Sequence, residues 1–152
     1  MPATLDAEAV NRWCRVGLRD LHQARVEIDT INVYPVPDGD TGTNLCLTME
    51  AVVEALGVDG AGPHAEGAAA SGAGDLAGTL RTIAHAALLG AQGNSGVILS
   101  QLLRGLTEEL GGGVRADGEA LAAALRRAAD LGYAAVGSPV EGTVLTVARA
   151  AA

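Results

Sequence analysis

The sequence contains no lysine and no phenylalanine, and all ten of its basic residues are arginines. A P-loop nucleotide site places a lysine on the β- and γ-phosphates, and a protein kinase needs a lysine on one strand of its nucleotide-binding lobe. The absence of lysine excludes both kinds of site. Any phosphate bound here must be held by backbone amides, a metal ion or arginine.

Aromatic residues are almost missing, at 2%, although hydrophobic residues reach 49% of the 152 positions. The core must therefore consist of leucine, valine, isoleucine and alanine. A core rich in alanine and poor in aromatic and β-branched residues favours closely packed helices over a sheet. The length suits one domain with its own core, and we expect residues 1–152 to form a single domain.

Long apolar runs and a basic, apolar leader are also absent, so we expect a cytoplasmic protein without an integral membrane segment. The formal net charge of −8 argues against binding to nucleic acid, which requires a basic surface. Cys14 and Cys46 lack the spacing of a CxxC motif and are interpreted as reduced core residues. His22, His64 and His85 show no ligand-like spacing.

Apolar residues recur at helical spacing in six segments, which predicts an all-α fold of antiparallel, up-and-down helices. The first helix is predicted from about residue 5 to 29, with Thr4 as its N-cap, and residues 57–74 are interpreted as a loop rich in Gly and Ala. The other helices are expected from Thr41 to Gly57, over about 75–90, from Val97 to Leu110, after the cap Asp117, and from the turn 138–143 to Ala152.

The first polar turn, Asp38-Gly39-Asp40, carries two carboxylates separated by one glycine. Both can face one hard cation, and oxygen ligands of this kind suit Mg²⁺. Asn32 or Asp29 can supply a further oxygen, and Thr41, Thr43 and Asn44 follow at the start of the next helix. The alternative is an ordinary Pro-Asp-Gly turn followed by a helix cap. An EF-hand loop is a poor match, because its twelfth residue would be Met49.

Two further glycine-containing turns precede predicted helices. The second holds Gly93, Asn94, Ser95 and Gly96, whose glycines permit close approach to a ligand, and the third holds Glu141, Gly142 and Thr143. Helix starts of this kind bind anions through their amides and the helix dipole, and the three turns could converge at one end of the bundle. The alternative for each is a simple helix cap.

These three segments resemble the motifs of a known family. Asn32-Val-Tyr-Pro-Val-Pro-Asp-Gly-Asp-Thr-Gly-Thr-Asn44, residues 90–105 and residues 139–149 resemble, in this order, the signatures of the nucleotide-binding domain of bacterial fatty acid kinases. That domain is similar to the DhaL-like nucleotide-binding subunit of dihydroxyacetone (glycerone) kinases. The resemblance covers nearly the whole chain, so it implies that residues 1–152 form one nucleotide-binding kinase domain.

The resemblance implies a barrel of eight antiparallel helices that binds ATP/ADP and two Mg²⁺ ions at one end. It implies Asp38, Asp40 and Asn32 as metal ligands, and Thr41 and Thr43 as catalytic residues beside the phosphates. It assigns nucleotide contacts to a further set of residues: Asn44, Gly93, Asn94, Ser95, Gly96, Gly142 and Thr143. Only six of the eight helices are predicted here, so we expect a truncated domain and possible homo-oligomers.

The resemblance also implies the reaction, in which the γ-phosphoryl group of ATP moves to a fatty acid held by a DegV-like partner protein. A carboxylate acceptor is already ionised and needs no general base, and no residue in the sequence stands out as one. A dihydroxyacetone-type kinase subunit and a nucleotide-binding module without catalytic activity are the alternatives.

Overall fold

A computed structural model of the chain describes residues 4–33, 37–57, 75–113 and 115–152. The predicted loop 57–74 lies outside the described residues except for Gly57. The described residues form six α-helices and no strand, so the predicted all-α class is confirmed. Their bounds are α1 Ala7–Ile31, α2 Thr41–Leu56, α3 Leu76–Leu89, α4 Gly93–Leu110, α5 Gly118–Ala134 and α6 Val144–Ala151.

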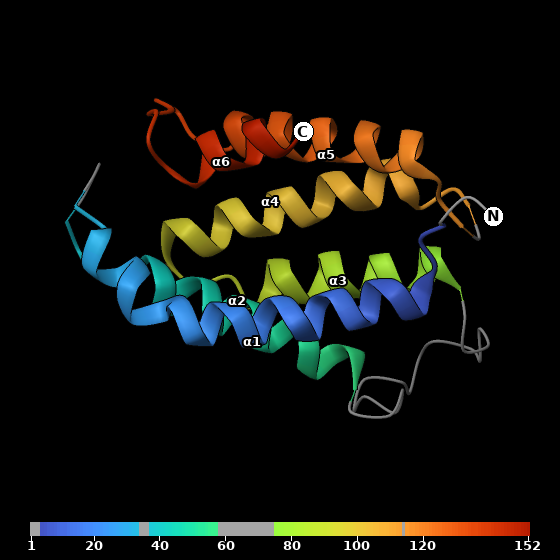
Figure 1. Cartoon of the computed structure of the whole chain (residues 1–152), viewed down its shortest axis with the longest axis horizontal. Helices are drawn as coiled ribbons and strands as arrows, with labels where there is room; N and C mark the ends of the chain where they lie inside the picture. The colour runs from blue at the N-terminus through green and yellow to red at the C-terminus, as the bar shows by residue number, and fades with distance from the viewer. Residues whose placement is uncertain (1–3, 34–36, 58–74, 114) are drawn as a thin grey trace.

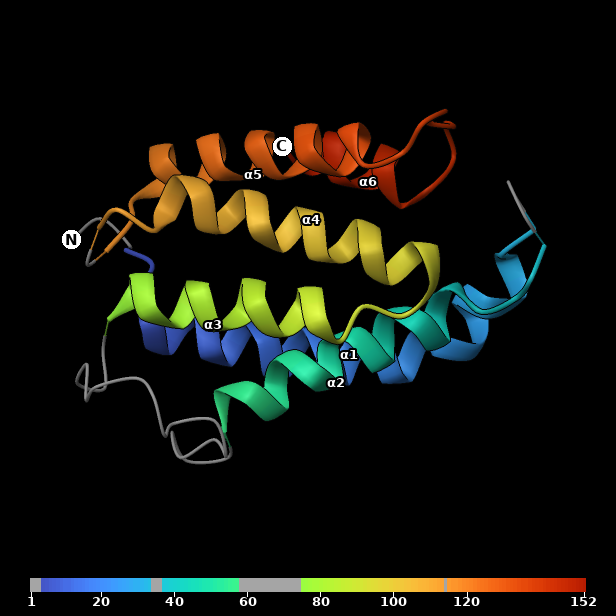
Figure 2. The same ribbon diagram turned by 180° about the vertical axis from the view of Figure 1, so that it is seen from behind.

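The helices run alternately in opposite directions along one axis (Figure 1). α4 lies in the middle and contacts α2, α3 and α5, while α1 packs on α2 and α3, and α6 packs on α5. The view from behind shows the same arrangement, with α3 in front of α1 (Figure 2). As a result α1, α3 and α5 begin at one end of the bundle, and α2, α4 and α6 begin at the other.

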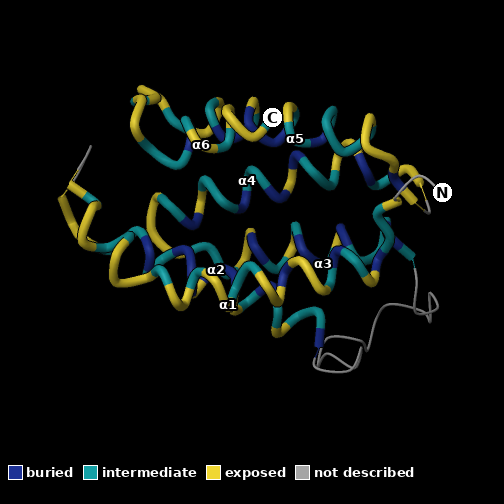
Figure 3. The backbone as a smooth tube through the Cα atoms, viewed as in Figure 1, coloured by how far each residue is buried: buried dark blue, intermediate teal, exposed yellow. Residues whose placement is uncertain are grey.

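The core is built from small and aliphatic side chains, as the composition predicts. Buried positions face inward along α1 to α5 (Figure 3). The central cluster includes Cys14, Met49, Val52, Leu76 and Ile83, all at most 5% exposed. The single tryptophan, Trp13, is half exposed and takes no part in this cluster. Helices with small side chains approach closely, which compensates for the missing aromatic residues.

Both cysteines are buried and free, as expected. Burial raises the pKa of the Cys14 thiol to about 11, and it also raises the pKa of Cys46. The two thiols therefore stay protonated at neutral pH and behave as small apolar residues.

The first helix begins later than predicted, because the residues before it pair with a distant segment. Leu5 exchanges two backbone hydrogen bonds with Ala116, of 2.7 and 3.0 Å, and is therefore extended. Asp6, whose Oδ1 accepts from the amide of Ala9 at 2.9 Å, is the N-cap in place of Thr4. The helix then continues to Ile31, two residues past the predicted end.

The fourth helix also differs from prediction at its start, whereas the sixth begins directly after the predicted turn 138–143. α4 begins at Gly93, so the segment predicted as a turn forms the first turn of the helix. Its contacts with α2, described below, outweigh the poor helix propensity of glycine. α6 begins at Val144 with Thr143 as its cap. Every helix within the described ranges is too short or too polar to span a bilayer.

Candidate functional site

The predicted site residues precede or begin α2, α4 and α6, and all three helices start at the same end of the bundle (Figures 1 and 2). This arrangement meets the condition for the three segments to converge. The first two make direct contact with each other, because the hydroxyl of Ser95 donates to Thr41 Oγ1 at 3.2 Å. No contact joins the α6 helix to α2 or α4 among the described residues.

The N-terminus of α2 is held by side chains from the end of α1. Asn32 Oδ1 accepts from the amides of Asp40 and Thr41, at 3.2 and 3.1 Å, and from the Thr41 hydroxyl at 2.8 Å. The Asp40 side chain forms no cap hydrogen bond of its own. The first amides of α2 therefore donate to a side chain at the end of α1, a contact that no local sequence pattern indicates.

Asp29 makes a second contact between α1 and α2, two residues further along α2 at Thr43. Its carboxylate accepts from the amide of Thr43 at 3.0 Å and from the Thr43 hydroxyl at 2.8 Å. Arg25 donates to the same hydroxyl at 3.4 Å. Burial raises the pKa of Asp29, but the hydrogen bonds from Thr43 and Gly42, together with nearby Arg25, outweigh it. The pKa of Asp29 therefore lies below its ordinary value of 3.8.

The first turn of α4 lies directly on the polar face of α2. Gly93 has a φ of +57°, and a Cβ atom there would collide with the side-chain amide of Asn44. A Cβ at Gly96 would collide with the hydroxyl of the fully buried Thr48, which accepts from the amide of Gln92 at 3.1 Å. The two glycines thus permit the close approach of the two helix starts.

The N-terminus of α4 differs from that of α2 in how its amides are used. α4 has no side-chain cap, and the amides of Gly93, Asn94 and Ser95 have no hydrogen-bond partner among the described residues. The side chains of Gln92 and Asn94 are exposed. An uncapped helix start that faces solvent presents donors and the positive end of the dipole to an anion.

The third segment forms a local network of its own. The hydroxyl of Thr143 accepts from the amide of Leu145 at 3.3 Å, so Thr143 caps α6. Glu141 accepts from the hydroxyls of Thr146 and Tyr133, which lowers the pKa of its carboxyl. The amide of Gly142 donates to Thr146 at 2.9 Å. The capping interpretation is confirmed for Thr143, and nucleotide contacts of Gly142 and Thr143 stay a prediction.

The metal-binding prediction depends on Asp38 and Asp40. The Asp38 side chain is exposed, that of Asp40 is partly exposed, and neither carboxylate bonds to another described residue. Two unpaired carboxylates on one loop fit a hydrated, hard cation. Asn32 fits less well, since its oxygen already accepts three donors and would have to release one to bind a metal. Within the described ranges no three His, Cys, Asp or Glu side chains form a metal-ligand group.

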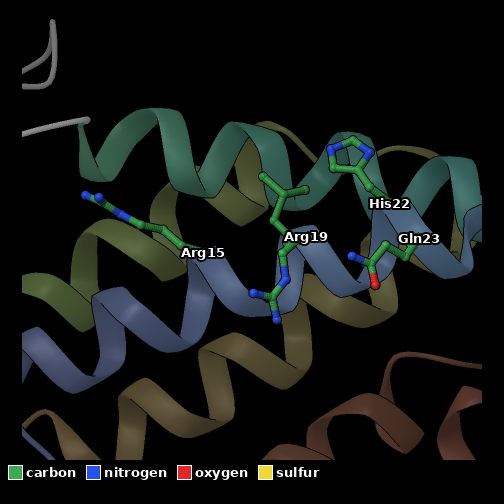
Figure 4. Close-up of a pocket in the computed structure, with 5 residues that line it drawn as sticks. Arg15, Arg19, His22 and Gln23 are labelled. Carbon is green, nitrogen blue, oxygen red and sulfur yellow. The ribbon is translucent and has the colours of Figure 1, made fainter.

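A shallow hollow lies away from this end, on the surface of α1. It is lined by Arg15, Leu18, Arg19, His22 and Gln23, whose polar groups point in different directions (Figure 4). Arg15 donates to the carbonyl of Gly57 at 2.9 Å, and His22 lies 3.2 Å from Glu50. These contacts attach α1 to α2, and the hollow is separate from the predicted site.

Comparison with known proteins matches most of the chain to one family. The model of the DAK2 domain matches residues 35–152, which include every predicted site residue except Asn32. The chain belongs to the DAK2 domain family. This family is that of the dihydroxyacetone kinases, in which the domain is a nucleotide-binding module.

Three bacterial relatives contain a segment similar to this DAK2 domain. Protein YloV of Bacillus subtilis is 41% identical over 152 residues, which cover 98% of this chain and 25% of that protein. The uncharacterized protein SSP1546 of Staphylococcus saprophyticus is 39% identical over 100% of this chain and 25% of its own length. The uncharacterized protein SAUSA300_1119 of Staphylococcus aureus is 40% identical over 90% and 23%, respectively. The chain thus spans about a quarter of the length of these relatives.

Proposed function

We propose that the chain is the nucleotide-binding domain of an ATP- and Mg²⁺-dependent kinase of the fatty acid kinase type. Membership of the DAK2 domain family supports nucleotide binding. The observation that carries the proposal is the pairing of two helix starts through Ser95 and Thr41, at 3.2 Å. Among the residues that the structure describes, the amides at one of them have no partner, and neither do the carboxylates of Asp38 and Asp40 before the other.

In this proposal the amides of Gly93, Asn94 and Ser95 receive a phosphate of ATP. These donors carry partial positive charge, which is most useful where negative charge gathers during phosphoryl transfer. Gly142 and Thr143 directly precede α6, which starts at the same end, and they complete the nucleotide side. The helix starts compensate in this way for the absence of lysine.

Asp38 and Asp40 are the residues that would hold Mg²⁺, which neutralises phosphate charge when it is bound. Asn44 and Gly93 set the distance between the metal-binding loop and the phosphate-binding turn, because they are in close contact. The hydroxyl protons of Thr41 and Thr43 are directed toward Asn32 and Asp29. Both hydroxyl oxygens therefore present lone pairs to their other neighbours, and the two side chains keep a fixed orientation.

The proposed acceptor is the carboxylate of a fatty acid, presented by a DegV-like partner. An oxygen of this carboxylate forms a bond to the γ-phosphorus as the bond to the bridging oxygen breaks, giving an acyl phosphate and ADP. The acceptor is already ionised, so the chain needs no general base. A hydroxyl acceptor such as dihydroxyacetone would require one, and no histidine lies among the site residues described above.

Calorimetric titration with ADP, with and without Mg²⁺, tests the binding step. We expect Mg²⁺-dependent binding that weakens at least about tenfold in the double variant Asp38→Asn, Asp40→Asn, because two charge-assisted metal contacts are removed. Asp130→Asn, at an exposed position on α5, is the matched control and should bind like the original chain. Unchanged Mg²⁺-dependent binding in the double variant would exclude the metal assignment.

The acceptor is tested by the release of ADP from ATP with each candidate. We expect turnover with a fatty acid bound to a DegV-like protein and none with dihydroxyacetone. The reverse result would assign the chain to the dihydroxyacetone kinases. Binding of Mg²⁺–ADP without turnover on either acceptor would favour a nucleotide-binding module without catalytic activity.

A further inference from the structure

The residues from Asp40 into α2 are held by one side chain at the end of α1, that of Asn32. Asn32 follows the last residue of α1, and its Oδ1 accepts from the amide of Asp40 eight residues later. The same oxygen accepts from the amide and the hydroxyl of Thr41, the first residue of α2. A single amide oxygen therefore holds the backbone at Asp40 and Thr41.

Asp29 makes a second attachment between the same two helices. Its two carboxylate oxygens accept from the amide and the hydroxyl of Thr43, at 3.0 and 2.8 Å. A Cβ atom at Gly42 would collide with the backbone of Arg25 and contact the Asp29 carboxylate, so the helices can approach this closely only with glycine there. We term Asp29 and Asn32 the α1 clamp. Asp29 lies in the last turn of α1, and Asn32 is the residue directly after this helix.

The α1 clamp occupies the side-chain oxygen of Asn32 and leaves the carboxylate of Asp40 without a capping role. An amide oxygen has two lone pairs, and three donors already share Oδ1 of Asn32. The neighbouring Asp40 provides an N-cap without a side-chain cap bond, so Asn32 performs the capping that Asp40 would otherwise perform. The Asp40 carboxylate is thereby left available.

We infer that Asn32 is a positioning residue for the metal-binding loop rather than a metal ligand, and that Asp29 supports it through Thr43. The inference rests on the proposed function for its effect on Mg²⁺–nucleotide binding. The clamp itself exists in the metal-free chain and can be measured there. Loss of the clamp releases the N-terminus of α2, so Asp40 loses the fixed backbone position from which its carboxylate extends.

Hydrogen exchange of the metal-free, nucleotide-free chain is the first test. The amides of Asp40 and Thr41 are at a helix start, where amides usually exchange freely, and yet we expect them to be protected by Asn32. The amides of Gly93, Asn94 and Ser95 at the start of α4 provide the internal comparison and should exchange at least about tenfold faster. Equal rates at the two helix starts would overturn the clamp without any variant being made.

Substitution of Asn32 separates positioning from ligation. In Asn32→Ala we expect the protection of Asp40 and Thr41 to be lost, Tm of the metal-free chain to fall by about 2–4 °C, and affinity for Mg²⁺–ADP to fall about tenfold. Asn32→Asp keeps an oxygen acceptor and should retain the protection. Thr30→Ala, whose hydroxyl bonds only within α1, is the matched control.

Each other outcome is decisive. If Asn32→Ala loses affinity for Mg²⁺–ADP while the metal-free Tm and exchange stay unchanged, Asn32 is a ligand and the inference is wrong. If protection is lost but affinity stays unchanged, Asn32 is a structural cap alone and the positioning role is wrong. If the original chain does not bind Mg²⁺–ADP at all, the proposed function fails, and the exchange comparison still decides whether the clamp exists.

Discussion

The two ends of the helical bundle begin their helices in different ways. At one end α1, α3 and α5 are each capped by the aspartate that precedes them: Asp6, Asp75 and Asp117 accept from amides of their own helices. At the other end, α2 is capped from α1, α4 has no side-chain cap, and only α6 is capped by its own residue, Thr143. The three aspartate caps place a negative charge at the starts of α1, α3 and α5, and this charge repels an anionic ligand.

The absence of a side-chain cap on α4 is informative because most other helices of the bundle have one. An N-cap contributes about 1 kcal/mol, so a helix start without one gives up stability. Within the described residues, α4 does so where Ser95 contacts Thr41, the residue after Asp40. This departure marks the end of the bundle where we propose that the nucleotide binds.

The largest effect is expected from a methyl group placed between the two helix starts at the site end. In Gly96→Ala the new Cβ collides with the Thr48 hydroxyl, and we expect a loss of about 1–3 kcal/mol in the free energy of unfolding. Affinity for Mg²⁺–ADP should also fall, since α4 is displaced from α2. Urea unfolding and calorimetry measure the two effects.

Gly118→Ala is the matched control for this substitution at the opposite end. Gly118 is the first residue of α5, and nothing lies within 4 Å of a Cβ added there. We expect this variant to be as stable as the original chain or slightly more stable. If Gly96→Ala is as stable as the original chain, the close contact between α2 and α4 is not required for stability, and the proposed difference between the two ends of the bundle is wrong.

A smaller effect is expected from removal of a cap at the opposite end. Asp117→Ala removes the acceptor for the amide of Ala120, at 2.9 Å, and should cost about 1 kcal/mol of stability. Affinity for Mg²⁺–ADP, measured well below Tm, should stay unchanged because α5 begins far from the site. A change in affinity similar to that of Gly96→Ala would show that the two ends are not functionally distinct.

The smallest effect concerns the pH dependence of the contact at Asp29. The pKa of Asp29 is held below 3.8, mainly by hydrogen bonds from Thr43 that outweigh its partial burial. A carboxyl with a lowered pKa in the folded state adds stability above its unfolded pKa and loses it as the pH falls through the folded value. The stability difference between the original chain and Asp29→Asn should therefore be constant above about pH 5 and shrink toward pH 3 and below.

Urea unfolding of both chains over this pH range provides the measurement, and the difference between them removes the contribution of the other acids. Equal pH dependence in the two chains would mean that the Asp29 carboxylate is not held by Thr43. The expected effect is small because the group is partly exposed to water.

Much of the fold could be predicted from the sequence because the apolar spacing of each helix is local. The bounds of α2 and α3 match the prediction within a residue, and Asp117 caps α5 as expected. The predicted start of α1, with Thr4 as its N-cap, was wrong because Leu5 pairs with Ala116, and no local sequence pattern indicates this contact. The predicted start of α4 was wrong because Gly93 and Gly96 alone suggest a turn. Only their packing against α2 explains why they form the first turn of the helix.

For the candidate site, the sequence predicts which residues take part, and the structure adds some of the contacts among them. The spacing of Asp38 and Asp40 predicts two carboxylates that can face one cation, and the glycines at 93 and 96 predict the close backbone approach that the structure shows against α2. The attachment of α2 to Asn32 and Asp29 depends on how α1 and α2 pack, which is a property of the tertiary structure. The roles of these residues in metal and nucleotide binding stay predictions for the experiments above.

The pairing of Leu5 with Ala116 has a consequence for the order of folding. Contacts between α1 and α2, or between α3 and α4, join segments close in sequence and can form early. The two hydrogen bonds between Leu5 and Ala116 close a loop that contains α1 to α4, so their entropic cost is met only after those helices have packed. The segment before α1 should therefore be among the last parts of the chain to become ordered and among the first to detach on unfolding.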